Sequence, residues 1–296
     1  MPDALRAPTR LRTATLTTLA LLAFAGNSLL CRAALAHTDI DPASFTAIRI
    51  VSGAMMLVLL LALRPGPVPA AGSWRSAAAL FAYAIAFSYA YKGLSAGTGA
   101  LLLFGAVQAT MLVAGLFTGT RWSLWQALGL ALALAGLVGL LWPGLSAPPL
   151  EPAALMLGAG FAWGLYTLRG RGLPDALAAT TGNFMRAAPM AVIAAGVAWS
   201  WLRPDLEGAL LALASGALTS GLGYAIWYSA LRGLSPQAAG SAQLSVPVVT
   251  ALAGVLLLGE AIDLRLALGS VAVLGGIAMT LTWRKAQRTV AGPRSR

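Results

Sequence analysis

The sequence has little charge. Charged residues make up 10% of the 296 positions, hydrophobic residues make up 58%, and the mean hydropathy is +0.79. A soluble protein of this length needs far more charge to cover its surface, so the composition excludes an ordinary soluble domain. Apolar runs recur from near residue 13 to near residue 283 and leave no room for a separate soluble part. The sequence therefore predicts an all-α integral membrane protein.

Cysteine and histidine are almost absent. The single cysteine, Cys31, excludes an internal disulfide and a cysteine-based metal cluster. The single histidine, His37, lies near Asp39 and Asp41 in a predicted loop. These three could hold a cation, but a solvated acidic loop is the favoured interpretation. We expect no metal site and no cofactor.

The marks of a membrane-embedded enzyme are also missing. The sequence has no HExxH motif, no pair of intramembrane aspartates and no GxSxG motif around a deep serine. We therefore expect a protein that is not an enzyme.

The basic residues are numerous, and they give a net charge of +11. They stand singly at the ends of apolar runs, whereas a nucleic-acid site needs a basic patch with interleaved aromatics. We expect no nucleic-acid partner. The expected partners are the lipid bilayer and a small-molecule substrate, and the expected assembly is a monomer.

Charges, glycines and prolines divide the chain into ten predicted membrane spans of roughly 20 residues each. The predicted spans are 13–36, 43–63, 74–91, 98–118, 123–142, 152–170, 177–202, 207–231, 236–258 and 262–283.

The distribution of arginine and lysine predicts the orientation. Ten spans place both termini on one side, and most basic residues fall on that side. The basic residues assigned to the other side are Arg32, Lys92, Arg203 and Arg265. Cytoplasmic loops carry the excess of basic residues. We therefore expect a bacterial inner (plasma) membrane protein with both termini, including a basic tail at 284–296, in the cytoplasm.

Residues 1–36 also resemble a cleaved signal peptide, with a basic start, an apolar middle and "ALA" before His37. Cleavage would leave nine spans and spoil the charge distribution, so a retained first helix is favoured.

The chain contains an internal repeat. A shift of 140 residues without gaps places "KGLSAGTGALLLFGAVQATMLVAGLFTGTRWSLWQALGLALALAG" over "RGLSPQAAGSAQLSVPVVTALAGVLLLGEAIDLRLALGSVAVLGG". Glycines and one threonine stay in register, and Arg49 corresponds more loosely to Arg186. The predicted halves, 13–142 and 152–283, each have five spans. An odd number inverts the second half, and inverted repeats are a transporter architecture with a midplane site.

The segment "GLSPQAAGSAQLSVPVVTALAGVLLLGEAIDLRLALGSVAVLGGIAM" closely resembles the second repeat unit of the drug/metabolite transporter superfamily, in its EamA-type branch. The resemblance rests on the small-residue hairpin, Pro247, the Gly259-Glu260 pair and the later glycines. The first half is similar through "NSLLCRAAL", "SFTAIR" and "GLALALAG", and departs at Val107-Gln108 and Gly119-Thr120.

The resemblance implies ten helices, cytoplasmic termini and alternating access around a central cavity. Family members carry amino acids, purines, nucleotide sugars, triose phosphates or cationic drugs. Bacterial amino-acid and metabolite exporters are the nearest analogues.

Nine residues are candidates for substrate binding because they are aromatic or polar at predicted membrane depth: Asn27, Tyr83, Phe87, Gln108, Trp163, Tyr166, Trp227, Tyr228 and Gln243. The deep aromatics share helix faces by spacing, and cavity lining and ordinary packing remain open for them. Polar side chains in lipid need a partner or water, so hydrogen bonds between helices are the alternative for the amides.

Four further residues are assigned other roles. Pro247 cannot donate to the carbonyl of Gln243, which predicts a bend near 243–247 that faces the cavity and moves during gating. Glu260 is predicted to bind backbone amides of the turn into the last helix. Arg49 and Arg186 are predicted to be structural charges that snorkel toward a membrane surface.

The predicted function is a secondary transporter of small organic metabolites, such as amino acids or similar amphipathic solutes, that exports them by alternating access. The alternative is a substrate-selective pore or facilitator without alternating access. No Asp or Glu lies in the middle of a predicted span, so uniport, exchange and proton coupling remain open.

Overall fold

A computed structural model describes residues 9–65, 71–117, 123–144, 147–170, 173–203, 205–234 and 236–290, and for residues 116, 117, 236, 237 and 282–290 the backbone alone. Every regular element in these ranges is helical. The predicted all-α class is therefore confirmed. Each of the ten predicted span ranges contains helix in the structure.

The first half of the chain forms α1 (Arg10–His37), α2 (Pro42–Ala62), α3 (Trp74–Tyr91), α4 (Ala96–Phe117) and α5 (Leu124–Leu141). The second half forms α6 (Leu150–Gly170), α7 (Ala176–Val197), the short η2 (Trp199–Trp201), α8 (Leu206–Ala214), η3 (Ser215–Leu222), α9 (Gly223–Leu231), α10 (Pro236–Gln243), α11 (Ser245–Leu258) and α12 (Leu264–Val290). The element η3 is a π-helix that joins α8 and α9 into one helical run.

Seven helical segments of the described chain are long and apolar enough to cross a membrane. They are residues 10–37, 42–62, 96–115, 124–141, 206–231, 238–258 and 264–281. The helices α3, α6 and α7 are not among them. By length and apolar composition, the described chain thus has seven membrane-capable helical segments and not the ten predicted spans.

Local capping signals set several helix ends. Asp41 accepts hydrogen bonds from the N–H groups of Ala43 and Ser44 at 2.9 Å, and Pro42 occupies the first position of α2. Ser123 and Gln126 form a capping box at α5. The left-handed Gly259, with φ of 65°, ends α11.

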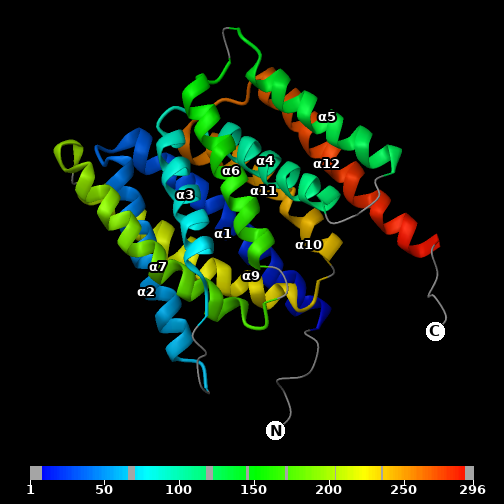
Figure 1. Cartoon of the computed structure of the whole chain (residues 1–296). Coiled ribbons are helices and arrows are strands. Elements are labelled where there is room, and N and C mark those ends of the chain that lie inside the picture. Colours follow the sequence, from blue (N-terminus) through cyan, green and yellow to red (C-terminus); the bar gives the residue numbers. More distant parts are fainter. Residues whose placement is uncertain are drawn as a thin grey trace.

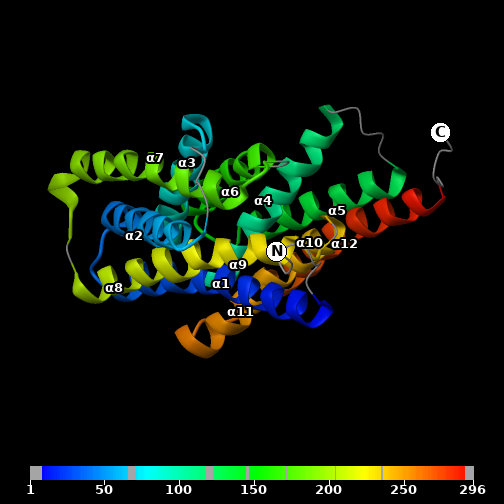
Figure 2. The same ribbon diagram turned by 90° about the horizontal axis from the view of Figure 1, so that it is seen from below.

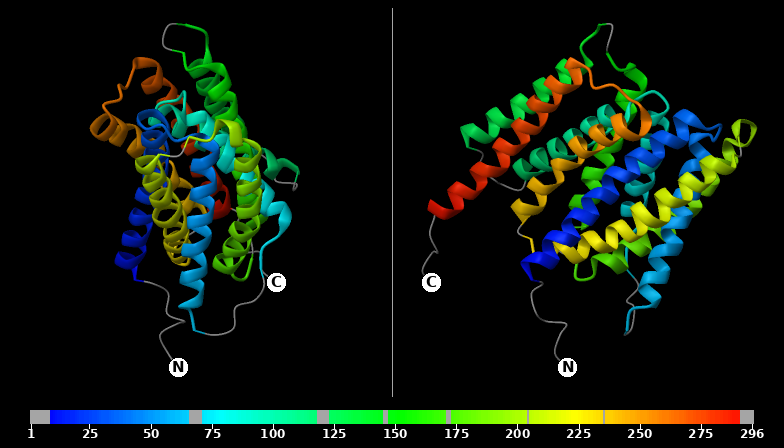
Figure 3. Two further views of the ribbon diagram at one scale, coloured as in Figure 1. Left: turned by 90° about the vertical axis from the view of Figure 1, so that its left-hand side faces the viewer. Right: turned by 180° about the vertical axis from the view of Figure 1, so that it is seen from behind.

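The two halves interlock through corresponding helices. The first helix of each half packs on the third and fourth helical segments of the other half: α1 contacts α8, η3, α9 and α11, whereas α6 contacts α3 and α4. The second helices, α2 and α7, pack on each other, and so do the last helices, α5 and α12. Figures 1 and 3 show α5 and α12 side by side at the edge of the molecule. Figure 2 shows the α2–α7 pair at the opposite side, with α1, α3, α4, α6 and α9 between the two pairs.

Glycines permit the close contact of α5 with α12. A Cβ placed at Gly129 would lie 2.6 Å from the carbonyl oxygen of Gly276, and a Cβ at Gly276 would lie 2.4 Å from that of Gly129. Small residues are the usual means by which membrane helices approach closely. The outer surface carries many large apolar side chains, including Leu256 and Val271, which a bilayer would cover.

Candidate functional site

A cavity of about 370 Å³ lies between the two halves of the chain. Its walls come from both halves, because Asn27 of α1 and Tyr83 of α3 line it together with Trp163 of α6 and Trp227 of α9. This size lies within the range of small-molecule sites, which are mostly apolar with a few polar groups that fix orientation.

The cavity extends to the end of the bundle at which α1 begins. Gly170, Leu173, Ala176 and Leu231 line it there, and we call this group the mouth. Leu231 packs against the same small apolar cluster as Leu16, which lies in the first turns of α1, and this places the mouth at that end. Leu173 is 43% exposed, so the cavity reaches the surface at the mouth.

Aromatic rings form much of the wall. The ring centre of Trp163 lies 4.5 Å from that of Tyr83, 5.4 Å from that of Tyr224 and 5.5 Å from that of Tyr166. Phe24 and Trp227 meet edge to face at 5.7 Å. Offset and edge-to-face contacts of this kind hold the rings in place and give the cavity rigid, amphipathic walls.

A polar cluster lies in the wall opposite the mouth. Arg49 donates from Nη2 to the hydroxyl of Tyr83 at 2.9 Å and from Nε to Ser220 at 3.5 Å. Asn27 donates to the same tyrosine hydroxyl at 3.4 Å and accepts from Ser215 at 2.8 Å. These five side chains come from four different elements, and we call them the Arg49 cluster.

The π-helix η3 positions two members of this cluster. Ser215 and Ser220 both belong to η3, and α2 lies directly against it. A Cβ at Gly216 would come within 2.1 Å of the Arg49 carbonyl oxygen, so this glycine permits the contact. π-helical turns often occur at functional sites, because the extra residue redirects side chains.

A second polar cluster lies closer to the mouth. The hydroxyls of Thr180 and Tyr228 are 2.8 Å apart, and Tyr166 donates to Thr180 at 3.4 Å. Asn183 donates to Tyr166 at 3.5 Å and accepts from the Ser73 N–H at 2.9 Å. Four hydrogen-bonding side chains of α6, α7 and α9 therefore lie along one side of the cavity.

A stack of three aromatic rings lies beyond the cavity on α3. The centres of Tyr83 and Phe87 are 5.3 Å apart, and those of Phe87 and Tyr91 are 4.7 Å apart. Tyr83 lines the cavity, whereas Tyr91 lies at the far end of α3. The stack separates the cavity from that end of the bundle.

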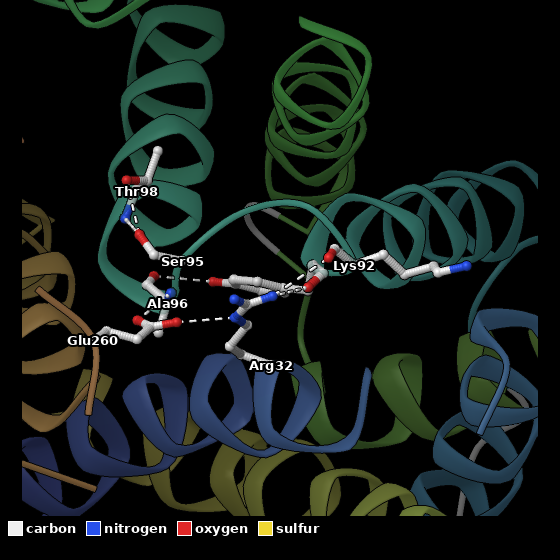
Figure 4. A network of polar contacts seen from close by, with 7 residues as sticks. Arg32, Lys92, Ser95, Ala96, Thr98 and Glu260 are labelled. Carbon is white, nitrogen blue, oxygen red and sulfur yellow. Dashed lines mark hydrogen bonds and ion pairs between the residues drawn. The ribbon is translucent and has the colours of Figure 1, made fainter. Parts of the chain in front are cut away.

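An ionic network lies at the far end, and Figure 4 shows it. Arg32 of α1 donates from Nε to Oε1 of Glu260 at 2.9 Å and from Nη1 to the Tyr91 carbonyl at 3.0 Å. Glu260 accepts from the Ala96 N–H at 2.8 Å, at the first residue of α4. This Arg32–Glu260 network joins α1, the α3–α4 turn and the loop after α11.

Comparison with known proteins identifies the family. The model of the EamA-like transporter family matches the chain twice, over residues 11–142 and 151–282. The chain belongs to the EamA-like transporter family.

Two further comparisons give proteins that are similar to this chain in sequence or in fold. An uncharacterized protein of Pseudomonas aeruginosa is 61% identical over 274 residues, which are 92% of this chain and 96% of that protein. A crystal structure of another protein superposes with a TM-score of 0.64, covers 90% of this chain and 98% of its own, and shares 18% identity. At that identity the likeness concerns the fold alone.

In this EamA-like transporter, most of the substrate-binding candidates line the cavity. They are Asn27, Tyr83, Trp163, Tyr166, Trp227, Tyr228 and Gln243. The other two, Phe87 and Gln108, do not line it. Phe87 is fully buried in the ring stack between Tyr83 and Tyr91. Gln108 is also buried, but the adjacent Val107 faces the cavity, and successive helical side chains point about 100° apart.

The expectation that Arg49 snorkels toward a membrane surface is wrong. Its side chain lines the cavity and is 3% exposed, because Tyr83 and Ser220 hold it inward. Arg186 behaves differently and donates to the carbonyls of Ala71 and Gly182 at 3.0 and 2.8 Å. The corresponding arginines therefore have different environments in the two halves.

The predicted binding partner of Glu260 is also wrong. Its carboxylate bonds the first N–H of α4 and Arg32, whereas Asp263 caps α12 through the Leu266 N–H at 2.7 Å. Near Pro247, the helical run is interrupted at Leu244 between α10 and α11, and Gln243 lines the cavity. The interruption falls within the stretch predicted to bend.

Several cavity residues were not among the candidates. Tyr224 shares the helix face of Trp227 and Tyr228, so its spacing could have identified it. Thr180 and Ser220 carry no such signal, because threonine and serine are common in membrane helices and the π-helix redirects Ser220. Phe24 falls on α1 with no aromatic neighbour at helical spacing.

Proposed function

We propose that this protein is a secondary transporter that exports small organic metabolites by alternating access. The observation that carries the proposal is the cavity, which opens at the mouth and ends beneath the aromatic stack and the Arg32–Glu260 network. A carrier in one of its two end states has such a site, accessible from one side and closed toward the other.

The arrangement of the two halves supports the same mechanism. The reciprocal contacts of α1 and α6 are those of an approximate two-fold repeat. In the proposed topology ten helices cross the membrane and the second half is inverted, so the axis lies in the membrane plane. Rocking of one half against the other then opens the cavity to alternate sides.

The proposed orientation gives the direction of loading. Cytoplasmic termini follow from the excess of arginine and lysine at that side, and the mouth lies at the end where α1 begins. The cavity thus faces the cytoplasm of a bacterial inner membrane and accepts solute from it.

The lining defines the proposed class of substrate. Rings of Trp163, Tyr224 and Trp227 suit an apolar body, and the two polar clusters suit hydrogen-bonding groups. Amino acids and similar amphipathic solutes have both features.

Uptake by proteoliposomes tests the proposal. Purified protein is reconstituted and screened against radiolabelled amino acids, purines and organic cations, with and without a proton gradient, beside protein-free liposomes. We expect saturable uptake of at least one amphipathic solute. Trp163→Ala should reduce that uptake, whereas Trp201→Ala, at an exposed position outside the cavity, should not. Substrate-independent ionic conductance would favour a pore.

A further inference from the structure

The Arg49 cluster contains a buried cation that has no acidic partner in the described part of the chain. Arg49 is the one charged side chain among the described residues that line the cavity. Of the described acidic side chains, Glu260 pairs with Arg32 and Asp175 pairs with Arg64, and neither forms an ion pair with Arg49. A buried charge is costly unless it is paired, so an uncompensated arginine at a binding cavity indicates an anionic ligand.

The guanidinium has hydrogen-bonding capacity that the protein does not use. Its Nε and Nη2 donate to Ser220 and Tyr83, but Nη1 is buried and has no hydrogen-bond partner among the described residues. The central carbon of the guanidinium lies 4.9 Å from the ring centre of Phe87 and 5.2 Å from that of Tyr83. These ring contacts orient the cation without neutralising it.

Tyr83 supplies a second free donor. The Tyr83 hydroxyl oxygen accepts two hydrogen bonds, one from Arg49 and one from Asn27. Its own proton therefore remains available. A carboxylate has two oxygens that accept hydrogen bonds and matches such a pair of donors.

We propose that Arg49 is the counter-ion of a carboxylate on the transported solute, and that the Tyr83 hydroxyl is the second donor. This inference rests on the proposed transport function and names its substrate class, a monocarboxylate with an apolar or aromatic body. The carboxylate occupies the part of the cavity beside Arg49, and the body lies against Trp163 and Tyr224. A phosphate would call for more than the single cation that lines this cavity.

Binding to the purified full-length protein tests the inference with three matched pairs of probes. The carboxylates are 3-phenylpropionate, hexanoate and L-phenylalanine, and each is compared with its primary amide, which has nearly the same shape without the negative charge. Affinity is measured by calorimetry and thermal shift. We expect at least one carboxylate to bind about 10–100-fold more tightly than its amide, since this is the usual effect of a charge-assisted hydrogen bond.

Variants then assign the preference to Arg49. Arg49→Gln should abolish the difference between carboxylate and amide, and Arg49→Lys should retain part of it. Tyr83→Phe keeps the cation and should weaken carboxylate binding by a smaller factor, so the test survives if Arg49→Gln does not fold. Arg186→Gln is the matched control, because Arg186 bonds backbone carbonyls outside the cavity. It should leave the preference unchanged.

The outcomes separate this inference from the transport proposal. Three results would overturn the inference. They are equal binding of carboxylates and amides, no binding of any of the three carboxylates, and an unchanged preference in folded Arg49→Gln protein. Carboxylate binding that depends on Arg49 supports it even if reconstituted protein moves no solute, a result that would contradict the transport function alone.

Discussion

Ser28 and Arg32 lie one turn apart on α1, and they belong to two different sites of the molecule. Ser28 lines the cavity, whereas Arg32 bonds Glu260 in the network at the far end. Side chains four positions apart lie on the same face of a helix. A small movement of α1 would therefore displace Ser28 in the cavity and Arg32 in the network together. In the proposed transport cycle, α1 thus couples the cavity to the closed end.

The first prediction concerns this network. Arg32→Gln and Glu260→Gln should each lower the free energy of unfolding by about 1–3 kcal/mol, since each removes hydrogen bonds that involve a charged group. The double variant should lose less than the sum of the two single losses, because the two side chains share one interaction and each has a further bond of its own. Thermal unfolding in detergent measures these values. Asp263→Asn, which affects the α12 cap, is the control and should add independently to Arg32→Gln. Additive losses for Arg32 and Glu260 would mean that their contact contributes nothing.

The second prediction concerns the break at Leu244. Pro247→Ala supplies an N–H that can bond the Gln243 carbonyl across the break, so stability should be equal or higher. A straighter and stiffer helix should slow transport severalfold. Initial uptake rates and unfolding temperatures are measured together. Pro189→Ala, at an exposed proline inside α7, is the matched control and should leave the rate unchanged. An unchanged rate in Pro247→Ala protein would make the break a packing feature.

The third prediction concerns the contact of α2 with η3. A Cβ at Gly216 would lie 2.0 Å from Ser52 Oγ and 2.1 Å from the Arg49 carbonyl oxygen, so Gly216→Ala must displace α2. We expect a loss of about 1–3 kcal/mol, which is typical of overpacking. Gly158→Ala has nothing within 4 Å of the new methyl group and should be neutral or slightly stabilising. The unfolding midpoints of the two variants test this prediction, and equal midpoints would argue against close packing of α2 on η3.

The fourth prediction concerns pH. Asp175 caps α7 by accepting a hydrogen bond from the Ala178 N–H, and it forms an ion pair with Arg64 at 2.5 Å. The Ala178 hydrogen bond and Arg64 lower the pKa of the Asp175 carboxyl, although burial opposes them. A lowered pKa in the folded state means that the carboxylate stabilises the fold above the unfolded value of about 3.9 and loses this effect as the pH falls. At pH 7, Asp175→Asn should therefore be less stable than the native protein by about 0.5–1 kcal/mol, because asparagine can still cap the helix but loses the negative charge at its N-terminus and the ion pair with Arg64.

The difference between the native protein and Asp175→Asn should shrink as the pH drops below about 4. Unfolding temperatures measured from pH 3 to pH 7 follow this change. A difference that stays constant over the whole range would exclude the carboxylate charge as its cause.

The sequence predicted the helical class and seven of the cavity-lining residues because these depend on local patterns. Apolar runs of membrane length follow from composition, and aromatic spacing with membrane depth made Trp163, Tyr166 and Trp227 candidates, all of which line the cavity. Phe87 shares that spacing with Tyr83, but it packs against Arg49 and Tyr91 and does not line the cavity. The spacing of residues along one helix does not show which other helices pack against the face that these residues share.

The features that sequence reasoning missed depend on contacts between distant segments. The position of Arg49 in its predicted span suggests a place at a membrane surface, yet Ser220, 171 residues later, and Tyr83 hold it in the cavity. Glu260 was assigned to the following helix, but it bonds α4, 164 residues earlier in the chain. The π-helix that carries Ser220 has no local sequence signature that identified it.

The most direct test of alternating access is counterflow in proteoliposomes, with a solute identified by the uptake screen. Liposomes are loaded with unlabelled solute, and the entry of the labelled solute is followed over a range of external concentrations. A single cavity that opens to one side at a time predicts saturable entry that internal solute accelerates, because the loaded carrier returns faster than the empty one. Entry that rises linearly with concentration and does not respond to internal solute would contradict the account.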